Sequence, residues 1–225
     1  MAIMARKATM LGRLNVGGGI MTDPLHELGM VAFDFDGTMT VRDSFTAFLK
    51  WRTGSLRYAV GCLKLTPQVI VYLFDRNRGK LKAAAVREFL KGTRQEQLQE
   101  EARRFAEKNS GRLMRPDAVE TWRRWRTKGA KTIIVTASPD FVVAPFARGL
   151  GADGLIGTEL AFDAEGRCLG VFAGQNCRGP EKVRRLREVY GDDVRLTAAY
   201  GDTAGDKEML AIADEAGYRV FKGRP

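Results

Sequence analysis

The sequence predicts an α/β protein with a doubly wound parallel sheet and a helical segment inserted after the first strand. Three short apolar runs that end in polar residues are typical of buried parallel strands; they lie at 30–35, 131–138 and 195–202. Stretches of helical length separate the later runs, as in a sheet with helices on both faces. Residues 41–112 have helical character and no convincing strand alternation.

The N-terminal part of the chain is expected to hold a tail and then the first strand. Residues 1–28 have little periodicity and lack the apolar core and cleavage site of a secretory signal. The run MVAFDF at 30–35 is closed by the turn signal of Asp36 and Gly37, which predicts a buried strand. The expected boundaries are a loose tail at 1–28, a helical insert at 41–112, and a core made of 29–40 and 113–225.

Proline, glycine and apolar spacing predict the helix that follows the insert. Pro116 suits the first turn of a helix and Gly129 suits its end. Val119, Trp122 and Trp125 share one face of that helix, and we expect this face to pack in the core rather than to bind a ligand.

The C-terminal half is expected to alternate strands and helices. The turn signal DAEG at 163–166 lies between two apolar runs and predicts a hairpin or a pair of edge strands. The other expected elements are a strand at 131–138, a helix from Pro139, a helix from Pro180 to Gly191, a strand at 195–202, a helix at 203–214 and a last strand at 216–221.

Length and composition narrow the class of protein. A chain of 225 residues has room for one core domain with a modest insert. No stretch reaches the roughly 18 to 20 apolar residues that a membrane span needs. Three cysteines without metal-type spacing, together with the missing signal, predict a reducing compartment and thus the cytoplasm. The single histidine excludes a metal site built from a histidine cluster.

Polar side chains follow each of the three apolar runs. In open sheets of this kind, ligands bind beyond the carboxyl ends of the strands, so we expect these side chains to share one crevice. Four carboxylates in a crevice repel one another, but they suit Mg²⁺, which prefers one or two carboxylates, waters and substrate phosphate. The candidates are Asp34, Asp36, Thr136, Ser138, Asp202 and Asp206.

The same crevice has the groups that phosphoryl transfer requires. With a cation present, one carboxylate can attack an anionic phosphoryl group, and Lys182 supplies a second positive charge. Amides around Gly37 and at helix N-termini can donate to phosphate oxygens. Each piece alone is more often a turn, a helix cap or a solvated lysine. Their order, each after its own strand, favours the catalytic interpretation.

These segments together resemble the four motifs of the haloacid dehalogenase superfamily of phosphatases. The matching segments are DFDGT at 34–38, IIVTAS at 133–138, Lys182 in RGPEK, and YGDTAGDKEML at 200–210. The resemblance implies a Rossmann-like core, and the insert is similar to the helical cap of the phosphoserine phosphatase-like branch. It also implies hydrolysis of a phosphomonoester with Mg²⁺ as the cofactor.

The resemblance implies a role for each matching residue. Asp34 would be the nucleophile that forms an aspartyl-phosphate, and Asp36 the general acid and base, a carboxylate that favours phosphate esters over halides. Asp43 in the cap would face the substrate. The phosphoryl oxygens would be held by Gly37, Thr136, Ala137 and Lys182. The ligands of Mg²⁺ would be Asp34, the backbone carbonyl of Asp36, Asp202, and Asp206 directly or through a water.

The insert carries the net charge of the protein. Residues 41–115 hold 17 basic and 7 acidic side chains, which equals the total excess of +10. Residues 55–74 mix apolar and basic side chains and leave two interpretations open. In the first, the helices pack only on each other and over the site; in the second, residues 41–78 contact an anionic membrane peripherally, at its inner face.

Three function classes follow from this charge and these motifs. The segment CRGPEKVRRLREVYG is similar to bacterial phosphatidylglycerophosphatases, which implies a lipid phosphate substrate such as phosphatidylglycerophosphate. The alternative is phosphoserine or another small phosphorylated metabolite. A non-enzymatic basic module that binds nucleic acid is the third class, but the chain has no recognised DNA- or RNA-binding motif. The oligomeric state is left open.

Overall fold

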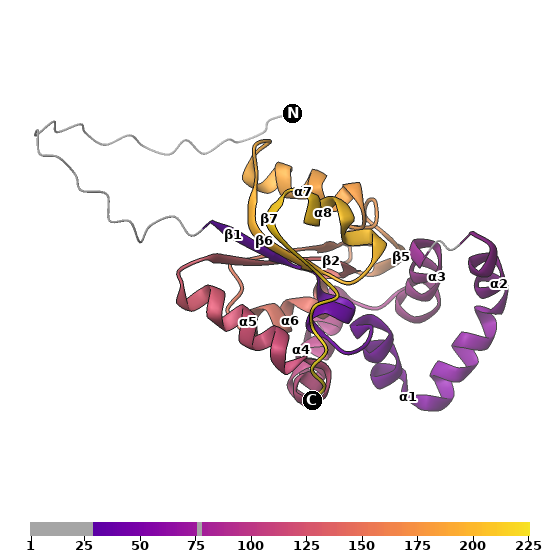
Figure 1. Ribbon diagram of the computed structural model, residues 1–225. Helices are drawn as coiled ribbons and strands as arrows, with labels where there is room; N and C mark the ends of the chain where they lie inside the picture. The colour runs from indigo at the N-terminus through magenta and orange to yellow at the C-terminus, as the bar shows by residue number, and fades with distance from the viewer. Residues whose placement is uncertain (1–28, 76–77) are drawn as a thin grey trace, which may run out of the picture.

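The computed structural model describes residues 29–75 and 78–225, so the tail expected at 1–28 lies outside the described residues. Its central feature is a five-stranded parallel sheet with the strand order β3-β2-β1-β6-β7 (Figure 1). The strands are β1 (Met30–Phe33), β2 (Lys131–Pro139), β3 (Gly154–Thr158), β6 (Leu196–Gly201) and β7 (Ala213–Tyr218). The predicted parallel sheet is confirmed.

Helices cover both faces of this sheet, which makes it doubly wound (Figure 1). Val31 and Phe33 of β1 face a large core cluster, and Ala32 between them faces a smaller one on the other side. The helices on the larger cluster are α5 (Pro116–Thr127) and α6 (Asp140–Leu150), and those on the smaller cluster are α7 (Pro180–Tyr190) and α8 (Lys207–Ala211). Trp122 and Trp125 are buried, as expected. Alternating apolar side chains on the strands thus hold two helical layers.

The hairpin expected around 163–166 forms only in part. β4 (Leu160–Phe162) pairs antiparallel with β5 (Cys168–Phe172). The residues just before β4 instead form β3, which pairs parallel with β2. Ile156 of β3 is buried in the smaller core cluster, so the edge of the main sheet offers this segment more apolar contact than a hairpin does.

Two other boundaries differ from the sequence-based expectation. The helix expected at 203–214 is a 3₁₀ turn, η2 (Ala204–Asp206), followed by the short α8. It ends early because Ala213 already pairs with Leu196 in the sheet. The last strand therefore covers 213–218 rather than 216–221.

Four helices lie between the first strand and α5, namely α1 (Ser44–Lys64), α2 (Thr66–Asp75), α3 (Arg78–Leu90) and α4 (Gln95–Leu113). Phe48 of α1 and Phe105 of α4 pack edge to face, and Phe105 also contacts Phe146 of α6. α1 bends at Gly54, whose φ of 75° suits glycine. Beyond the bend, α1 and α2 project away from the sheet (Figure 1).

The projecting part of α1 and α2 exposes many apolar side chains. Tyr58 stacks on Phe89 of α3, and Leu65 is buried, so this part packs partly on its neighbours. The exposed members are Leu56, Val60, Leu63, Val69, Ile70, Val71 and Leu73, with Leu56 at 82% and Leu63 at 76% exposure. Packing within the insert therefore accounts for only some of its apolar residues. Within residues 29–75 and 78–225, no helix has the length and apolar character to cross a bilayer.

Candidate active site

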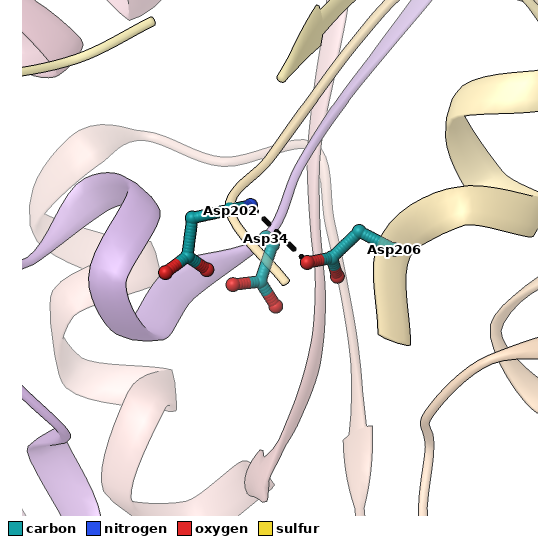
Figure 2. A group of neighbouring side chains, drawn as sticks. All are labelled: Asp34, Asp202 and Asp206. Carbon is teal, nitrogen blue, oxygen red and sulfur yellow. Dashed lines mark hydrogen bonds between the residues drawn. The ribbon is translucent and has the colours of Figure 1, made fainter. Parts of the chain in front are cut away.

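Three aspartates converge at the carboxyl edge of the sheet, from parts of the chain far apart in sequence. Asp34 follows β1, Asp202 follows β6, and Asp206 ends η2. One carboxylate oxygen from each lies within 4.8 Å of the others (Figure 2). β1 and β6 are neighbours in register, with Phe33 opposite Tyr200, which places the residues after them side by side. The expected convergence of these three residues is therefore present.

A tight turn after β1 lets Asp34 and Asp202 approach each other. The chain leaves the strand through η1 (Phe35–Met39), in which Gly37 has a φ of 86°. A Cβ at Gly37 would collide with the carboxylate of Asp202. Glycine is thus required here both by the backbone angle and by the close carboxylate.

Lys182, in the first turn of α7, joins two of the three aspartates. Its ammonium group donates to Asp34 Oδ1 at 2.7 Å, Asp206 Oδ1 at 2.7 Å and the Val135 carbonyl at 2.6 Å. Its side chain is 1% exposed. Burial alone lowers the pKa of a lysine, but Asp34 and Asp206 outweigh burial and raise the pKa of Lys182. The group therefore stays charged, and all three of its donors are used.

Burial and mutual repulsion set the charge state of the aspartates. Burial raises the pKa of Asp34 to about 7, against the attraction of Lys182. Burial and the nearby Asp206 raise the pKa of Asp202 as well. Burial also opposes ionisation of Asp206, but Lys182 holds the pKa of Asp206 below its usual value. Lys182 therefore compensates only part of the negative charge.

The oxygen atoms that remain fit a divalent cation. Asp206 has both oxygens engaged, Oδ1 by Lys182 and Oδ2 by the amides of Asp202 and Thr203 at 3.2 and 2.9 Å. Asp34 Oδ2 and Asp202 Oδ1 accept long hydrogen bonds from the Thr38 hydroxyl, at 3.3 and 3.4 Å. Two carboxylates with room for water and phosphate match the preference of Mg²⁺, and Asp206 suits a contact through water.

Asp36 lies beside this group but has different partners. Its Oδ1 accepts from the Ser44 amide at 2.7 Å, and its Oδ2 accepts from the Ser138 hydroxyl. Burial is the main reason that the pKa of Asp36 is raised, and Asp43 adds to it. A raised pKa favours the protonated form, which a general acid requires. In the described residues, the Asp36 carboxylate is not part of the three-aspartate group.

A pocket of about 80 Å³ holds most of the predicted site residues. Thr136 is 1% exposed and accepts from the Ser138 amide at 3.1 Å. Gly37 is not among the lining residues, and its amide donates to the Thr40 hydroxyl at 3.3 Å. The predicted residues that line the pocket are Asp34, Asp36, Asp43, Thr136, Ala137, Lys182 and Asp206. Two larger hollows, of about 340 and 490 Å³, contain none of these residues, whereas a third beside the insert shares Asp43.

Comparison with known proteins gives this arrangement a family. The haloacid dehalogenase-like hydrolase family matches residues 31–211. The chain belongs to this family. Protein CicA of Caulobacter vibrioides is 63% identical over 222 residues, which is 99% of this chain and 100% of the relative. Membership makes the protein a hydrolase, in agreement with the expectation that it is an enzyme.

Solved structures share the fold of this hydrolase. A Bordetella pertussis Tohama I protein with unknown function has a TM-score of 0.67 at 23% identity, covering 81% of this chain and 86% of that one. A phosphoserine phosphatase in the apo form has a TM-score of 0.58 at 19% identity, covering 84% of both chains. At these identities the likeness concerns the fold. The predicted resemblance to the phosphoserine phosphatase-like branch is thereby confirmed at the level of fold.

Lys82 on α3 is a site residue of this hydrolase that the sequence did not reveal. Its ammonium donates to the Ser138 hydroxyl at 2.9 Å and lies 3.2 Å from Asp43 Oδ2 and 3.6 Å from Asp36 Oδ2. Asp43 also accepts from the Thr46 amide at the start of α1. Burial opposes ionisation of Asp43, but Lys82 and this amide lower its pKa. No local pattern separates Lys82 from the other basic residues of the insert.

Asn176 and Arg178 were also missed. Both line the pocket from the segment that leads into α7. The Thr158 hydroxyl donates to Asn176 Oδ1 at 3.0 Å, which ties this segment to the end of β3. The sequence offered one signal, their position six and four residues before Lys182. Loops without apolar periodicity, however, give no direction for a side chain.

Proposed function

We propose that the protein is a Mg²⁺-dependent phosphomonoester hydrolase that acts through an aspartyl-phosphate on Asp34. The observation that carries this proposal is that Asp34 bonds Lys182 and lies next to Asp202, in a pocket that Asp36 also lines. A nucleophile needs neutralised surroundings to approach a phosphate, and Lys182 supplies part of that charge. Asp34 and Asp202 would hold Mg²⁺, which would supply the remaining positive charge.

The residues of the pocket divide the reaction into two steps. An Asp34 oxygen forms a bond to phosphorus while the bond from phosphorus to the ester oxygen breaks, and Asp36 gives its proton to the leaving alcohol. Asp36, now ionised, takes a proton from a water that attacks the same phosphorus and releases phosphate. Thr136 and the Ala137 amide position the phosphoryl oxygens. Lys182 attracts these oxygens through its charge, because its three donors already bond Asp34, Asp206 and the Val135 carbonyl. The role of the Gly37 amide in this step stays a prediction.

Asp36→Asn tests the acid and base role through its dependence on the leaving group. We expect turnover of ethyl phosphate to fall by about 10²- to 10⁴-fold, because an alkoxide leaves poorly without a proton. p-Nitrophenol leaves without help, so the variant should release one equivalent of p-nitrophenol in a burst and then turn over slowly. Stopped-flow absorbance measures the burst, and Asp192→Asn, at an exposed position, is the matched control. Equal losses for both esters without a burst contradict the role.

Two classes of substrate are proposed as alternatives. A lipid phosphate such as phosphatidylglycerophosphate agrees with the apolar, basic character of the insert, whereas phosphoserine or another small metabolite agrees with the fold of the solved relatives. Binding of nucleic acid by a basic surface uses none of the buried carboxylates, and no described feature of the pocket favours it.

We further propose that the outer part of α1 and α2 contacts an anionic membrane surface. Leu56, Val60 and Leu63 recur at helical spacing and are exposed, and residues 44–74 contain four basic and no acidic side chains. Arg57 and Lys64 share Glu88 as an ion-pair partner, so net positive charge remains. Apolar side chains next to cations are typical of interfacial helices. Residues 76 and 77 of the expected contact at 41–78 lie outside the described residues.

Flotation with vesicles checks this contact. We expect the protein to float with phosphatidylglycerol vesicles at low salt and to be released as salt screens the cations. Leu63→Asp should weaken binding by at least about tenfold, because a buried leucine contributes roughly 1.5 to 3 kcal/mol. Leu169→Asp changes an exposed leucine on β5 and is the matched control. Absence of flotation at low salt, or equal binding by both variants, counts against the proposal.

A further inference from the structure

A second cavity adjoins the phosphoryl pocket on the side of the insert. Its volume is about 370 Å³, against about 80 Å³ for the phosphoryl pocket. The two share Asp43 and Lys82 as lining residues. The wall is mostly apolar and comes from α1, α2 and α3; its members include Phe45, Leu49, Tyr58, Leu65, Ala85 and Phe89. The second cavity is thus a separate space whose polar end lies at the site.

The apolar wall is a defined structure rather than a loose gap. Phe45 and Leu49 of α1 are 2% and 3% exposed, and they belong to the large core cluster. Across the cavity, Phe89 is buried and stacks with Tyr58 at a centroid distance of 5.6 Å. Helices α1 and α3 therefore hold packed apolar surface around the space, and α2 adds Val69 to its wall.

The geometry of the site directs the leaving group toward this space. When a phosphoryl group lies on Asp34, the ester oxygen must lie at Asp36, which donates the proton. Asp36 Oδ2 is 3.6 Å from the Lys82 ammonium, and Lys82 is 3.2 Å from Asp43. Lys82 and Asp43 are the residues where the two spaces meet. An alcohol that extends past Asp36 therefore meets Lys82 and Asp43, on whose other side the second cavity lies.

The chemistry of the wall selects the kind of alcohol. A charged ammonium or carboxylate on the leaving group loses its hydration in such a cavity, and the paired Lys82 and Asp43 are the charged groups among its lining residues. A hydrocarbon chain gains from the same burial. We infer that the substrate is a phosphomonoester whose leaving alcohol carries a hydrocarbon chain, and that this chain occupies the cavity. The inference rests on the proposed function of the adjoining pocket.

A series of n-alkyl phosphates tests the inference. We expect kcat/KM to rise by about fourfold for each added methylene from ethyl to hexyl phosphate, the factor that corresponds to burial of one CH₂ group. All esters are used below their micelle concentrations. Ala85→Leu adds bulk to the cavity wall and should reduce the hexyl-to-ethyl ratio to near one. Ala59→Leu adds the same bulk on the exposed side of α1 and should keep the wild-type ratio.

The outcomes separate this inference from the proposed function. If kcat/KM is the same for all esters while turnover still requires Asp34, the inference is overturned and the proposed phosphatase activity stands. The same holds if kcat/KM rises along the series but Ala85→Leu does not change the rise. If no ester is hydrolysed, the proposed function fails. Calorimetry then compares binding of hexylphosphonate with binding of ethylphosphonate and tests whether the cavity binds a hydrocarbon chain. Tighter binding of the hexyl compound that Ala85→Leu removes supports the cavity, and equal binding overturns it.

The same assay also tests whether the hydrocarbon chain belongs to a membrane lipid or to a soluble ester. Phosphatidate in phosphatidylcholine vesicles presents a membrane lipid, whereas hexyl phosphate presents a soluble ester of the same chemistry. Preference for phosphatidate at equal ester concentration supports a lipid source, in line with the exposed apolar side chains on α1 and α2. Preference for hexyl phosphate supports a soluble source and overturns the lipid source.

Discussion

Asp34→Asn is expected to lower phosphate release from p-nitrophenyl phosphate by at least about 10³-fold, the scale of loss when a nucleophile is removed. The amide is a poor nucleophile, and it no longer offers an anionic oxygen to Mg²⁺. The shape of the side chain is kept, so the variant should fold. Release of p-nitrophenol in the presence of Mg²⁺ measures the loss.

Two controls make this result specific. In the wild-type protein, EDTA should remove activity and excess Mg²⁺ should restore it, whereas Mg²⁺ should not restore Asp34→Asn. Acid quenching with a radiolabelled phosphate ester should leave label on the wild-type protein and none on the variant. Turnover that persists in EDTA, or in Asp34→Asn, contradicts both the aspartyl-phosphate and the role of the metal.

Lys182→Met is expected to destabilise the metal-free protein by about 3 to 5 kcal/mol, the range for breaking a buried ion pair. The ammonium of Lys182 is 1% exposed and bonds Asp34, Asp206 and the Val135 carbonyl. Methionine fills similar space but leaves two buried carboxylates without a counter-charge. Urea unfolding measures the loss, and Lys207→Met, at an exposed position, should change stability by less than about 0.5 kcal/mol.

The destabilisation of Lys182→Met should increase with pH. Lys182 itself stays charged from pH 5 to 8, because its pKa is raised. The pKa of Asp206 is lower in the folded than in the unfolded protein, so ionised Asp206 stabilises the fold at pH values above its unfolded-state pKa. This stabilisation is lost as the pH falls through its folded-state pKa. The pKa of Asp34 is raised to about 7 with Lys182 present, and this shift has the opposite effect: it stabilises the fold at low pH. Without Lys182 both values rise, so the loss should be larger at pH 8 than at pH 5.5. Equal losses at both pH values contradict this account.

The sequence predicted the sheet and the carboxylate cluster because both depend on strand ends. Each of Asp34 and Asp202 follows an apolar run, and parallel strands bring such ends to one edge. Lys182 was found through its motif, and its helix was found through Pro180 and Gly191. These features can be recognised from short stretches of sequence, and the parallel sheet then brings the residues at its strand ends into contact.

Features that depend on pairing between distant segments were not predictable in the same way. β3 joins β2 rather than β5, and this pairing depends on the apolar edge that distant segments of the chain provide. The contact of Lys82 with Asp36 depends on how α3 lies over the site, and periodicity does not report the angle between a helix and a sheet. The apolar cavity arises from three helices at once, so no single stretch of residues indicates it.

The bent helix α1 and the cavity that it lines have a consequence for how such an enzyme diversifies. The cavity is lined by residues between Asp43 and Phe89, whereas the reacting carboxylates and Lys182 lie on the strand ends and on α7. If the cavity binds the alcohol as we infer, one continuous portion of the gene encodes the choice of alcohol, and separate portions encode bond cleavage. Mutations in α1, α2 and α3 that spare Lys82 are then expected to redirect the protein to a new ester, while its descendants inherit the phosphoryl chemistry unaltered.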